Sequence, residues 1–353
     1  MIKQLLKNKL AVAALSILTF LYLIIIFADF ISPYSKNYSD RERAYAPPSQ
    51  IYTINEKGKL SKPYTYNYIR EFDSSLMQTV YKQDRTHKYR IKFLGKGEKY
   101  KFLGIIPTTR HLITAEDGGC LYLLGTDING RDVFSRLLFG GRISLTIGFL
   151  ALLVLFPIGL LYGGISGYFG GIVDTVMMRF AEAVMAIPSF YLLIILAAIL
   201  PPNMTSSQRL ALIVVILALI GWAGFARVIR GMVLSIKTQE FVLAAKTIGA
   251  KPLRIITRHI LPQISSYIIV AVTLSVPSYI LSESGLSFLG LGIQQPDASW
   301  GNMLKEAQEY TNILYRPWLL TPGVLIFIAV VSFNIIGDTI RDILDPKKRI
   351  LIK

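Results

Sequence analysis

The chain has 353 residues, 52% of them hydrophobic, and its mean hydropathy of +0.48 excludes an ordinary soluble domain. The net charge of +16 comes from 38 Lys+Arg against 22 Asp+Glu, and in a membrane protein such an excess is first a signal of topology. A single cysteine excludes an intrachain disulfide framework, the three histidines have no ligand spacing, and no GxxxxGKS or GxxxxGKT sequence is present, which excludes a P-loop ATPase within this chain.

Residues 1–31 are expected to form a cytoplasmic N-terminus and a first transmembrane helix. The segment from Leu10 to Ile31 is apolar except for Asp29, and it is long enough to cross a bilayer whose hydrocarbon core is about 30 Å thick. Lys3, Lys7 and Lys9 precede it. A signal peptide is the alternative, but the apolar region is too long and no small-residue cleavage site follows. We therefore expect an uncleaved helix with its N-terminus inside.

Residues 32–124 differ in kind, because they are polar and contain 11 of the 19 tyrosines but no long apolar run. The period-two alternation from Tyr89 to Phe93, a turn at Gly95–Gly97 and renewed alternation from Tyr100 to Phe102 predict a β-hairpin. Ile51–Ile54 before 55–58 is a second strand-and-turn signal. We expect a small β-rich extracytoplasmic insertion, which either contacts a partner protein or serves as a lid or spacer.

Residues 125–142 precede the next span. Asp127 to Gly130 is predicted to be a turn, and Asp132 is expected to cap a helix that begins near Val133. Five further spans are predicted between 143 and 340, namely Ile143–Tyr162, Val173–Leu200, Leu210–Ile229, Ile264–Leu281 and Trp318–Ile336.

The connections between these spans have recognisable compositions. The Gly-rich run Gly163–Asp174 predicts a tight turn, and Leu286–Arg316 predicts a loop with an interfacial helix. Residues 341–353 form a charged tail. Several prolines are expected to kink helices, either as packing features or as hinges: Pro157, Pro188, Pro277 and Pro322.

The basic segment Gln239–Pro262 predicts a short helix, a turn centred on Gly249 and a second helix that starts at Pro252 and ends before Pro262. Lys and Arg residues of short loops cluster near the N-terminus, in Lys237–Arg258 and in the C-terminal tail. The positive-inside rule then places this loop and both termini in the cytoplasm. From the residues alone, the segment is either a docking surface or a solvated connection.

Three groups of residues resemble permease subunits of ABC importers. In Gln239–Pro262, the pair Ala244-Ala245 with Gly249 and Leu261-Pro262 resembles the EAA loop of that family, although Leu243 and His259 replace the usual Glu and Ile. The string LGTDINGRDVFSRLLFGGRISL (Leu124–Leu145) resembles the signature of the oligopeptide, dipeptide and nickel branch. Gly170–Ser189, Ser284–Leu304 and Phe333–Pro346 also resemble permease segments.

The resemblance implies an all-α polytopic membrane protein with six transmembrane helices of the ABC type-1 importer fold and the β-rich insertion between helices 1 and 2. It implies a permease core at 143–340 and an ATPase-coupling loop at 239–262. The implied coupling residues are Leu243, Ala244, Ala245, Lys246, Gly249, Ala250, Arg258, His259, Leu261 and Pro262. The implied signature residues are Gly125, Thr126, Asp127, Gly130, Arg131, Asp132, Ser135 and Arg136.

The resemblance also implies partners and a location. These are a second permease subunit in a heterodimer, one or two cytoplasmic ABC ATPases that bind ATP-Mg, and an extracytoplasmic substrate-binding protein. This chain would bind no cofactor or metal, catalyse nothing and contact no nucleic acid. It would lie in the inner or plasma membrane of a prokaryote and carry peptides or a similar small solute.

Candidate pathway residues are Glu283, Ser282 and Pro188. An ionisable group at membrane depth usually faces a cavity or a partner, so Glu283 either contacts substrate or bonds to a neighbouring helix. Glu182 is expected to pair locally with Arg179. The alternatives to an importer subunit are an ion-driven secondary transporter, for which we find no convincing internal repeat, and a membrane-anchored assembly protein.

Overall fold

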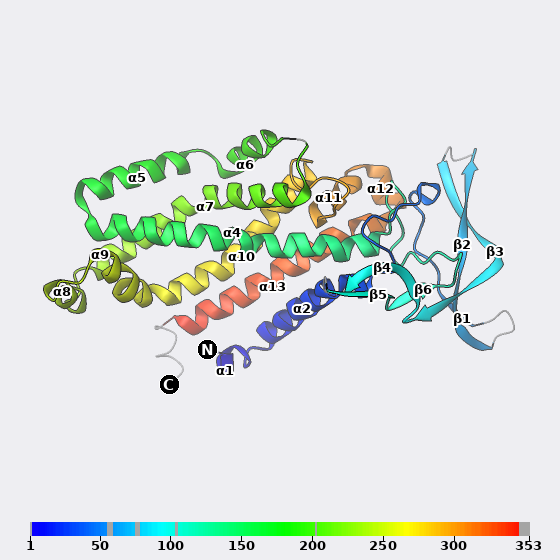
Figure 1. The fold of residues 1–353 in the computed structure, drawn as a ribbon, viewed down its shortest axis with the longest axis horizontal. Helices are drawn as coiled ribbons and strands as arrows, with labels where there is room; N and C mark the ends of the chain where they lie inside the picture. Colours follow the sequence, from blue (N-terminus) through cyan, green and yellow to red (C-terminus); the bar gives the residue numbers. More distant parts are fainter. Residues whose placement is uncertain (1, 55–58, 75–77, 103–104, 202, 346–353) are drawn as a thin grey trace. The chain divides into compact units, whose positions relative to one another are not determined.

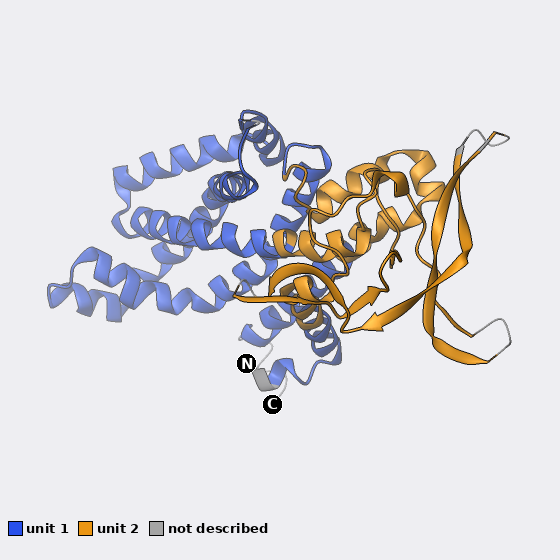
Figure 2. Ribbon diagram, turned by 45° about the vertical axis from the view of Figure 1, so that its right-hand side comes forward, with its two compact units in different colours: residues 1–18, 145–292, 327–353 blue, residues 19–144, 293–326 orange. Residues whose placement is uncertain are grey.

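The computed structural model describes residues 2–54, 59–74, 78–102, 105–201 and 203–345 (Figure 1). The described chain divides into two compact units (Figure 2). Unit 1 comprises residues 1–18, 145–292 and 327–353, and unit 2 comprises residues 19–144 and 293–326. Helices dominate unit 1, whereas unit 2 holds all the described strands.

The α-helices are α1 (Ile2–Leu5), α2 (Lys9–Ile26), α3 (Ala28–Ile31), α4 (Val133–Phe169), α5 (Gly171–Ala186), α6 (Ser189–Ala198), α7 (Ser206–Ile236), α8 (Glu240–Thr247), α9 (Pro252–Arg254), α10 (Ser265–Phe288), α11 (Trp300–Leu304), α12 (Tyr310–Tyr315) and α13 (Thr321–Leu344). The strands are β1 (Tyr52–Ile54), β2 (Leu60–Asp73), β3 (Gln78–Phe93), β4 (Lys96–Phe102), β5 (Ile106–Arg110) and β6 (Ile113–Ala115). Short 3-10 segments cover Arg41–Arg43, Leu261–Ile264, Lys305–Gln308 and Pro317–Leu320.

Five helical stretches in the described chain are long and apolar enough to cross a membrane, and a bent pair brings the number to six if it counts as one span. The bent pair is α5 with α6, whose axes meet at 78°. The predicted span from Val173 to Leu200 is therefore bent near Pro188, where a kink was expected. Ile187 has extended backbone angles and Pro188 has no N–H to donate, so the helical hydrogen bonds stop there.

Helix α4 is longer than the predicted span, because Gly163, Gly164 and Gly167 lie inside it rather than in a turn. A Cβ on Gly163 would stand 2.3 Å from the carbonyl oxygen of Ala226, so the missing side chain permits close approach of α4 to α7. The turn itself falls at Gly170 and Gly171, which both have positive φ.

The predicted prolines occupy different places in their helices. Pro157 lies within α4 and Pro277 within α10. Pro322 is the second residue of α13, directly after the 3-10 segment Pro317–Leu320.

The strands form a four-stranded sheet in the order β1-β2-β3-β6 and a separate β4–β5 hairpin. The predicted hairpin of Tyr89–Phe93 with Tyr100–Phe102 is wrong in its pairing, because β3 pairs with β2 and β6 while β4 pairs with β5. Leu94, at φ +53, turns the chain between β3 and β4. The strand at Tyr52–Ile54 is present and pairs with β2, and the predicted turn at 55–58 lies outside the described residues.

Candidate coupling loop and buried polar network

Helix α8 begins the loop that the sequence singles out. It ends in a Schellman arrangement, because the Ala250 N–H donates to the Ala245 carbonyl oxygen at 3.1 Å and the Gly249 N–H donates to that of Lys246 at 2.9 Å. Gly249 has φ +79, which a residue with a Cβ adopts only under strain. The predicted helix and glycine-centred turn are therefore present.

The second helix starts at Pro252 as predicted, but it does not end before Pro262. It continues as a π-helical turn (Ile255–Ile260), a 3-10 turn (Leu261–Ile264) and then α10. The N–H of Leu261 donates to the carbonyl oxygen of Ile256, five residues back. The wide π-helical turn and the tighter 3-10 turn accommodate Pro262, which has no backbone N–H to donate. The loop therefore continues into α10 without a break in the helix.

The inner face of the loop is a hydrophobic core within unit 1. Val242 and Ala245 of α8 are buried together with residues of α7 and of the segment after Pro252. The cluster consists of Ile229, Val233, Val242, Ala245, Ile255, Ile260 and Ile264. These buried apolar contacts pack the loop against α7 and the segment that leads into α10.

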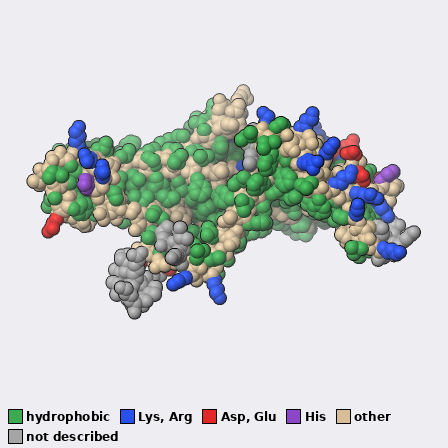
Figure 3. All heavy atoms as spheres, turned by 60° about the horizontal axis from the view of Figure 1, so that its bottom comes forward, with side chains coloured by type: hydrophobic (Ala, Val, Ile, Leu, Met, Phe, Trp, Pro, Cys, Tyr) green, Lys and Arg blue, Asp and Glu red, His purple; other side chains and the backbone are tan. Residues whose placement is uncertain are grey.

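The outer face of the loop exposes large apolar side chains beside basic ones. Ile248 is 84% exposed, Leu253 57% and Leu243 49%. In the space-filling view, basic side chains and a histidine gather where α8 and α9 lie, and hydrophobic side chains cover the neighbouring helices (Figure 3). Lys246, Ala244, Gly249 and Arg258 are also exposed, whereas Ala250, His259 and Leu261 are half-buried and Pro262 is exposed.

Two polar contacts fix the base of this loop. The Lys237 Nζ donates to the carbonyl oxygens of Gly167 at 2.8 Å and of Tyr168 at 3.3 Å. Asp174 of α5 binds Arg230 of α7 and accepts a 2.5 Å bond from the Ser166 hydroxyl of α4. Sequence reasoning did not pair these residues, because Asp174 and Arg230 are 56 positions apart and no short-range spacing connects them.

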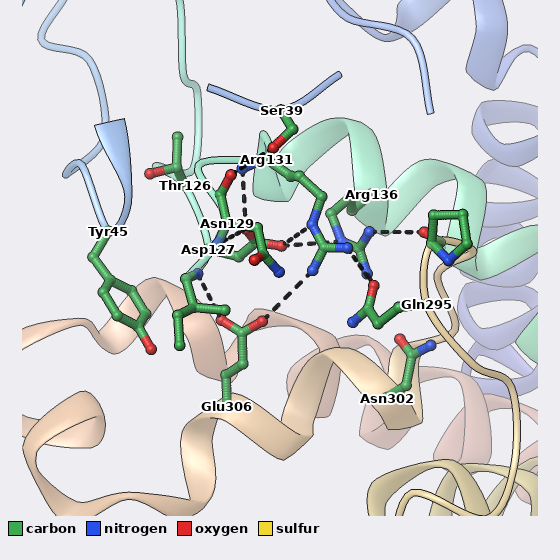
Figure 4. A network of polar contacts seen from close by, with 12 residues as sticks. Ser39, Tyr45, Thr126, Asp127, Asn129, Arg131, Arg136, Gln295, Asn302 and Glu306 are labelled. Atoms are coloured by element: carbon green, nitrogen blue, oxygen red, sulfur yellow. Dashed lines mark hydrogen bonds and ion pairs between the residues drawn. The ribbon is translucent and has the colours of Figure 1, made fainter. Parts of the chain in front are cut away.

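The signature residues form a separate buried network within unit 2 (Figure 4). Asp127 is its centre, because its Oδ2 accepts from the Arg131 Nε at 2.6 Å and lies 3.4 Å from the Arg136 Nε. Its Oδ1 accepts backbone N–H bonds from Asn129 at 2.8 Å and Arg131 at 3.0 Å. All three charged side chains are at most 8% exposed, so each requires its partners.

Glu306 and Gln295, from the segment after α10, complete the network and were not predicted as site residues. A Glu306 carboxylate oxygen accepts the Ile128 N–H at 3.0 Å, and the other lies 3.9 Å from Arg131. The Gln295 Oε1 accepts from both Arg131 and Arg136. Burial, together with the nearby negative charge of Asp127, raises the pKa of Glu306 above its usual range. No local pattern could have found these partners, because they lie more than 150 positions away.

Two other signature residues, Thr126 and Gly130, contact the loop at residues 40–46, which follows α3. The Thr126 hydroxyl accepts the Ala46 N–H at 2.7 Å and donates to the Arg43 carbonyl oxygen at 2.5 Å. Gly130 has φ +68, and a Cβ there would stand 1.7 Å from the carbonyl oxygen of Asp40. Gly125 has φ +72. The signature residues therefore form a compact turn, and the loop that contains Asp40, Arg43 and Ala46 packs against it.

Asp132 caps α4, as the sequence predicts. Its Oδ2 accepts the Ser135 N–H at 2.8 Å and the Ser135 hydroxyl at 2.5 Å, while its Oδ1 has no hydrogen-bond partner within the described residues. Burial raises the pKa of Asp132 to about 7, because the charged form is poorly solvated there.

The candidate pathway residues have different surroundings. Glu283 is fully buried, and its carboxylate accepts a 2.6 Å bond from the Ser287 hydroxyl one turn along α10. The Ser282 hydroxyl donates to the Ser278 carbonyl oxygen at 2.8 Å, and Pro188 is exposed at the break between α5 and α6.

The predicted pair of Arg179 and Glu182 is confirmed at 3.1 Å. No group of metal-binding side chains is found within the part of the chain that was described.

The sequence matches two family models of membrane transport proteins. Residues 137–350 match the family described as "Binding-protein-dependent transport system inner membrane component". Residues 1–48 match "N-terminal TM domain of oligopeptide transport permease C". The chain belongs to the family of binding-protein-dependent transport system inner membrane components, and it is a non-catalytic permease subunit of an ABC importer.

Several similar proteins are permease proteins of peptide or nickel transport systems. The dipeptide transport system permease protein DppC of Bacillus subtilis is 47% identical over 64% of this chain and 68% of the relative. The oligopeptide permease OppC of the same organism is 42% identical over 64% and 72%. The nickel permease NikC of Escherichia coli K12 is 38% identical over 63% and 78%. A solved MetNI methionine ABC transporter chain covers 60% of this chain at 19% identity and a TM-score of 0.44.

Proposed function

We propose that this permease subunit forms one half of a heterodimeric pore and couples it to separate cytoplasmic ATPases through residues 239–262. The observation that carries the proposal is the outer face of α8 and the turn after it. Leu243, Ile248 and Leu253 are exposed there, while Val242 and Ala245 anchor the same segment in the core. Apolar side chains held rigidly at the surface favour a protein partner over a solvated connection.

The geometry also supports a coupling mechanism. ATP-Mg would bind in the ATPase subunits, and closure of the ATPase dimer would move the loop. Because the loop shares its core with Ile229 of α7 and Ile264 at the start of α10, a displacement of α8 would move both helices. The helices would then pass between inward-open and outward-open states.

We propose the six-helix arrangement of type-1 importers, with the bent α5–α6 pair as one of the six. Positive charge in the short loops supports cytoplasmic termini and a cytoplasmic α8, with residues 32–124 outside. Family membership already supports a prokaryotic inner membrane as the location.

We propose peptides as the substrate class, delivered by an extracytoplasmic binding protein. The dipeptide and oligopeptide permeases among the relatives, at 47% and 42% identity, support this choice over nickel. The ion-driven secondary transporter is not supported by the family match.

The contacts of the signature and pathway residues support a structural role for each group. We propose that Gly125, Thr126, Asp127, Arg131 and Arg136 position the start of α4 against the segment that holds Glu306, since all of their charges are paired internally. Asp132 and Ser135 would fix the helix start. Glu283 would stabilise α10 rather than bind substrate, because it is fully buried and bonded to Ser287.

The test is copurification of the transporter in a mild detergent, with Ile248→Glu compared with Gln263→Glu. Ile248 is 84% exposed on the proposed docking face, and Gln263 is exposed on the 3-10 segment after it. We expect Ile248→Glu to lose the ATPase while keeping the second permease, and Gln263→Glu to keep both. Normal ATPase recovery with Ile248→Glu would refute the coupling assignment.

A further inference from the structure

The β4–β5 hairpin is fastened to the point where the first span ends. The Phe102 ring stacks on Phe27 with centroids 5.9 Å apart and meets Phe30 edge to face at 6.2 Å. Next to the hairpin, the Leu112 N–H donates to the Phe30 carbonyl oxygen at 2.7 Å. A His111 ring nitrogen lies 2.7 Å from the Ser32 carbonyl oxygen. Figure 1 shows β4 and β5 beside the end of α2.

This attachment sets the depth of the hairpin relative to the bilayer. Helix α2 has 18 residues, and at about 1.5 Å per residue it spans about 27 Å, close to the thickness of the hydrocarbon core. Three residues after α2, Asp29 pairs with Arg142 at 2.6 Å. Charged side chains are costly inside the hydrocarbon core, so this ion pair is expected near the boundary of the core. Because Phe102 touches Phe27 and Phe30, it lies beside the end of a helix that is long and apolar enough to cross a membrane.

The same end of the hairpin exposes apolar side chains that no described contact covers. Ile105 is 80% exposed and Ile106 is 59% exposed. Lys99 and Lys101 are exposed on β4 and form no ion pair within the described residues. Four basic residues and one acidic residue, Glu98, lie in the two strands. This combination suits the boundary between acyl chains and anionic headgroups.

We propose that the β4–β5 hairpin is an interfacial anchor that inserts Ile105 and Ile106 among lipid headgroups and binds anionic lipid through Lys99 and Lys101. The partner is the bilayer that α2 crosses. Fixing the hairpin at that surface would hold the remaining strands at a constant height above the membrane. The inference rests on α2 as a membrane span and requires neither the ATPase partners nor a particular substrate.

Depth-dependent quenching tests this inference on the assembled transporter in lipid nanodiscs. The single cysteine is first replaced by Cys120→Ser, and Ile105→Cys then carries an environment-sensitive fluorophore. Leu60→Cys is the matched control, because Leu60 is 90% exposed but lies on β2, outside the hairpin. Lipids with a spin label near the headgroup are the quenchers, in phosphatidylglycerol or phosphatidylcholine discs.

We expect blue-shifted emission and several-fold stronger lipid quenching at position 105 than at position 60. The double substitution Lys99→Glu with Lys101→Glu should reduce quenching in phosphatidylglycerol and change it little in phosphatidylcholine. Equal quenching at both positions, or quenching at 105 by aqueous iodide alone, would overturn the proposal. Protection of position 105 only when a binding protein is added would assign the hairpin to a protein contact instead. Because the readout is lipid proximity, each of these results leaves the permease function untouched.

Discussion

Gly249 shows how one backbone angle shapes the coupling loop. It has φ +79, and a Cβ added there would meet no atom within 4 Å, so the strain of a substitution is purely conformational. We predict that Gly249→Ala destabilises the loop by about 1–2 kcal/mol, the difference for an L-residue in the left-handed region. Limited proteolysis of the loop and recovery of the ATPase measure the effect.

Gly231 provides the matched control for that substitution. It lies inside α7, and a Cβ there would also meet nothing within 4 Å. Because alanine is favoured over glycine in a helix interior by up to about 1 kcal/mol, Gly231→Ala should be neutral or slightly stabilising. Equal proteolysis of the two variants would contradict the role given to the turn.

Asp132 gives a prediction about pH. Burial raises its pKa to about 7 in the folded protein, so between pH 4 and 7 the folded state holds a proton that the unfolded chain has released. The free energy of unfolding should therefore fall as the pH rises through this range, by at most about 4 kcal/mol from this group. Thermal unfolding in detergent at several pH values measures the slope.

The variant Asp132→Asn isolates that contribution. Asparagine retains the capping oxygen for Ser135 but does not titrate, so the pH slope between 4 and 7 should flatten. Asp117→Asn, at an exposed position, should leave the slope as it is. An unchanged slope in Asp132→Asn would show that this carboxyl is not the source.

The C-terminal end of helix α2 is bound by Arg142, a residue of α4. The guanidinium of Arg142 donates to the carbonyl oxygens of Ile25 at 3.0 Å and Ile26 at 3.1 Å, and it pairs with Asp29. These contacts satisfy carbonyl groups that a helix end otherwise leaves open. Arg142 therefore fastens the end of the first span to the helix that carries the last signature residues.

We predict that Arg142→Gln lowers the free energy of unfolding by about 1–2 kcal/mol, because the ion pair and the bond to Ile25 are only part-buried and the bond to Ile26 is exposed. Arg142→Lys should recover part of the loss, because it keeps the charge but not the forked donors. A double-mutant cycle with Asp29→Asn separates the ion pair from the cap. A coupling energy near zero would assign the whole effect to the carbonyl bonds.

The topology of the whole chain can be tested with the same cysteine variants. In the Cys120→Ser background, a membrane-impermeant thiol reagent should label Leu60→Cys in intact cells, because we place residues 32–124 outside. Thr247→Cys, exposed on α8, should react only after lysis. The reverse pattern would invert the orientation and remove the coupling loop from the cytoplasm.

Much of the secondary structure was predictable because its signals are local. The helix start at Val133 follows from the capping oxygen of Asp132, and the turn after α8 follows from a glycine four residues after Ala245. The strands around Tyr89 and Tyr100 follow from alternation, but their partners do not. Alternation fixes which face a side chain takes and contains no information about the neighbouring strand.

The sequence by itself determined that this is a polytopic membrane protein with a basic loop, because hydropathy, charge in short loops and glycine placement act over a few residues. Only the tertiary structure decided that Glu306 and Gln295 complete the Asp127 network, that Asp174 binds Arg230, and that β4–β5 rests on the end of α2. These contacts join residues tens to more than a hundred positions apart. Their geometry depends on how whole helices and strands pack, which no local pattern records.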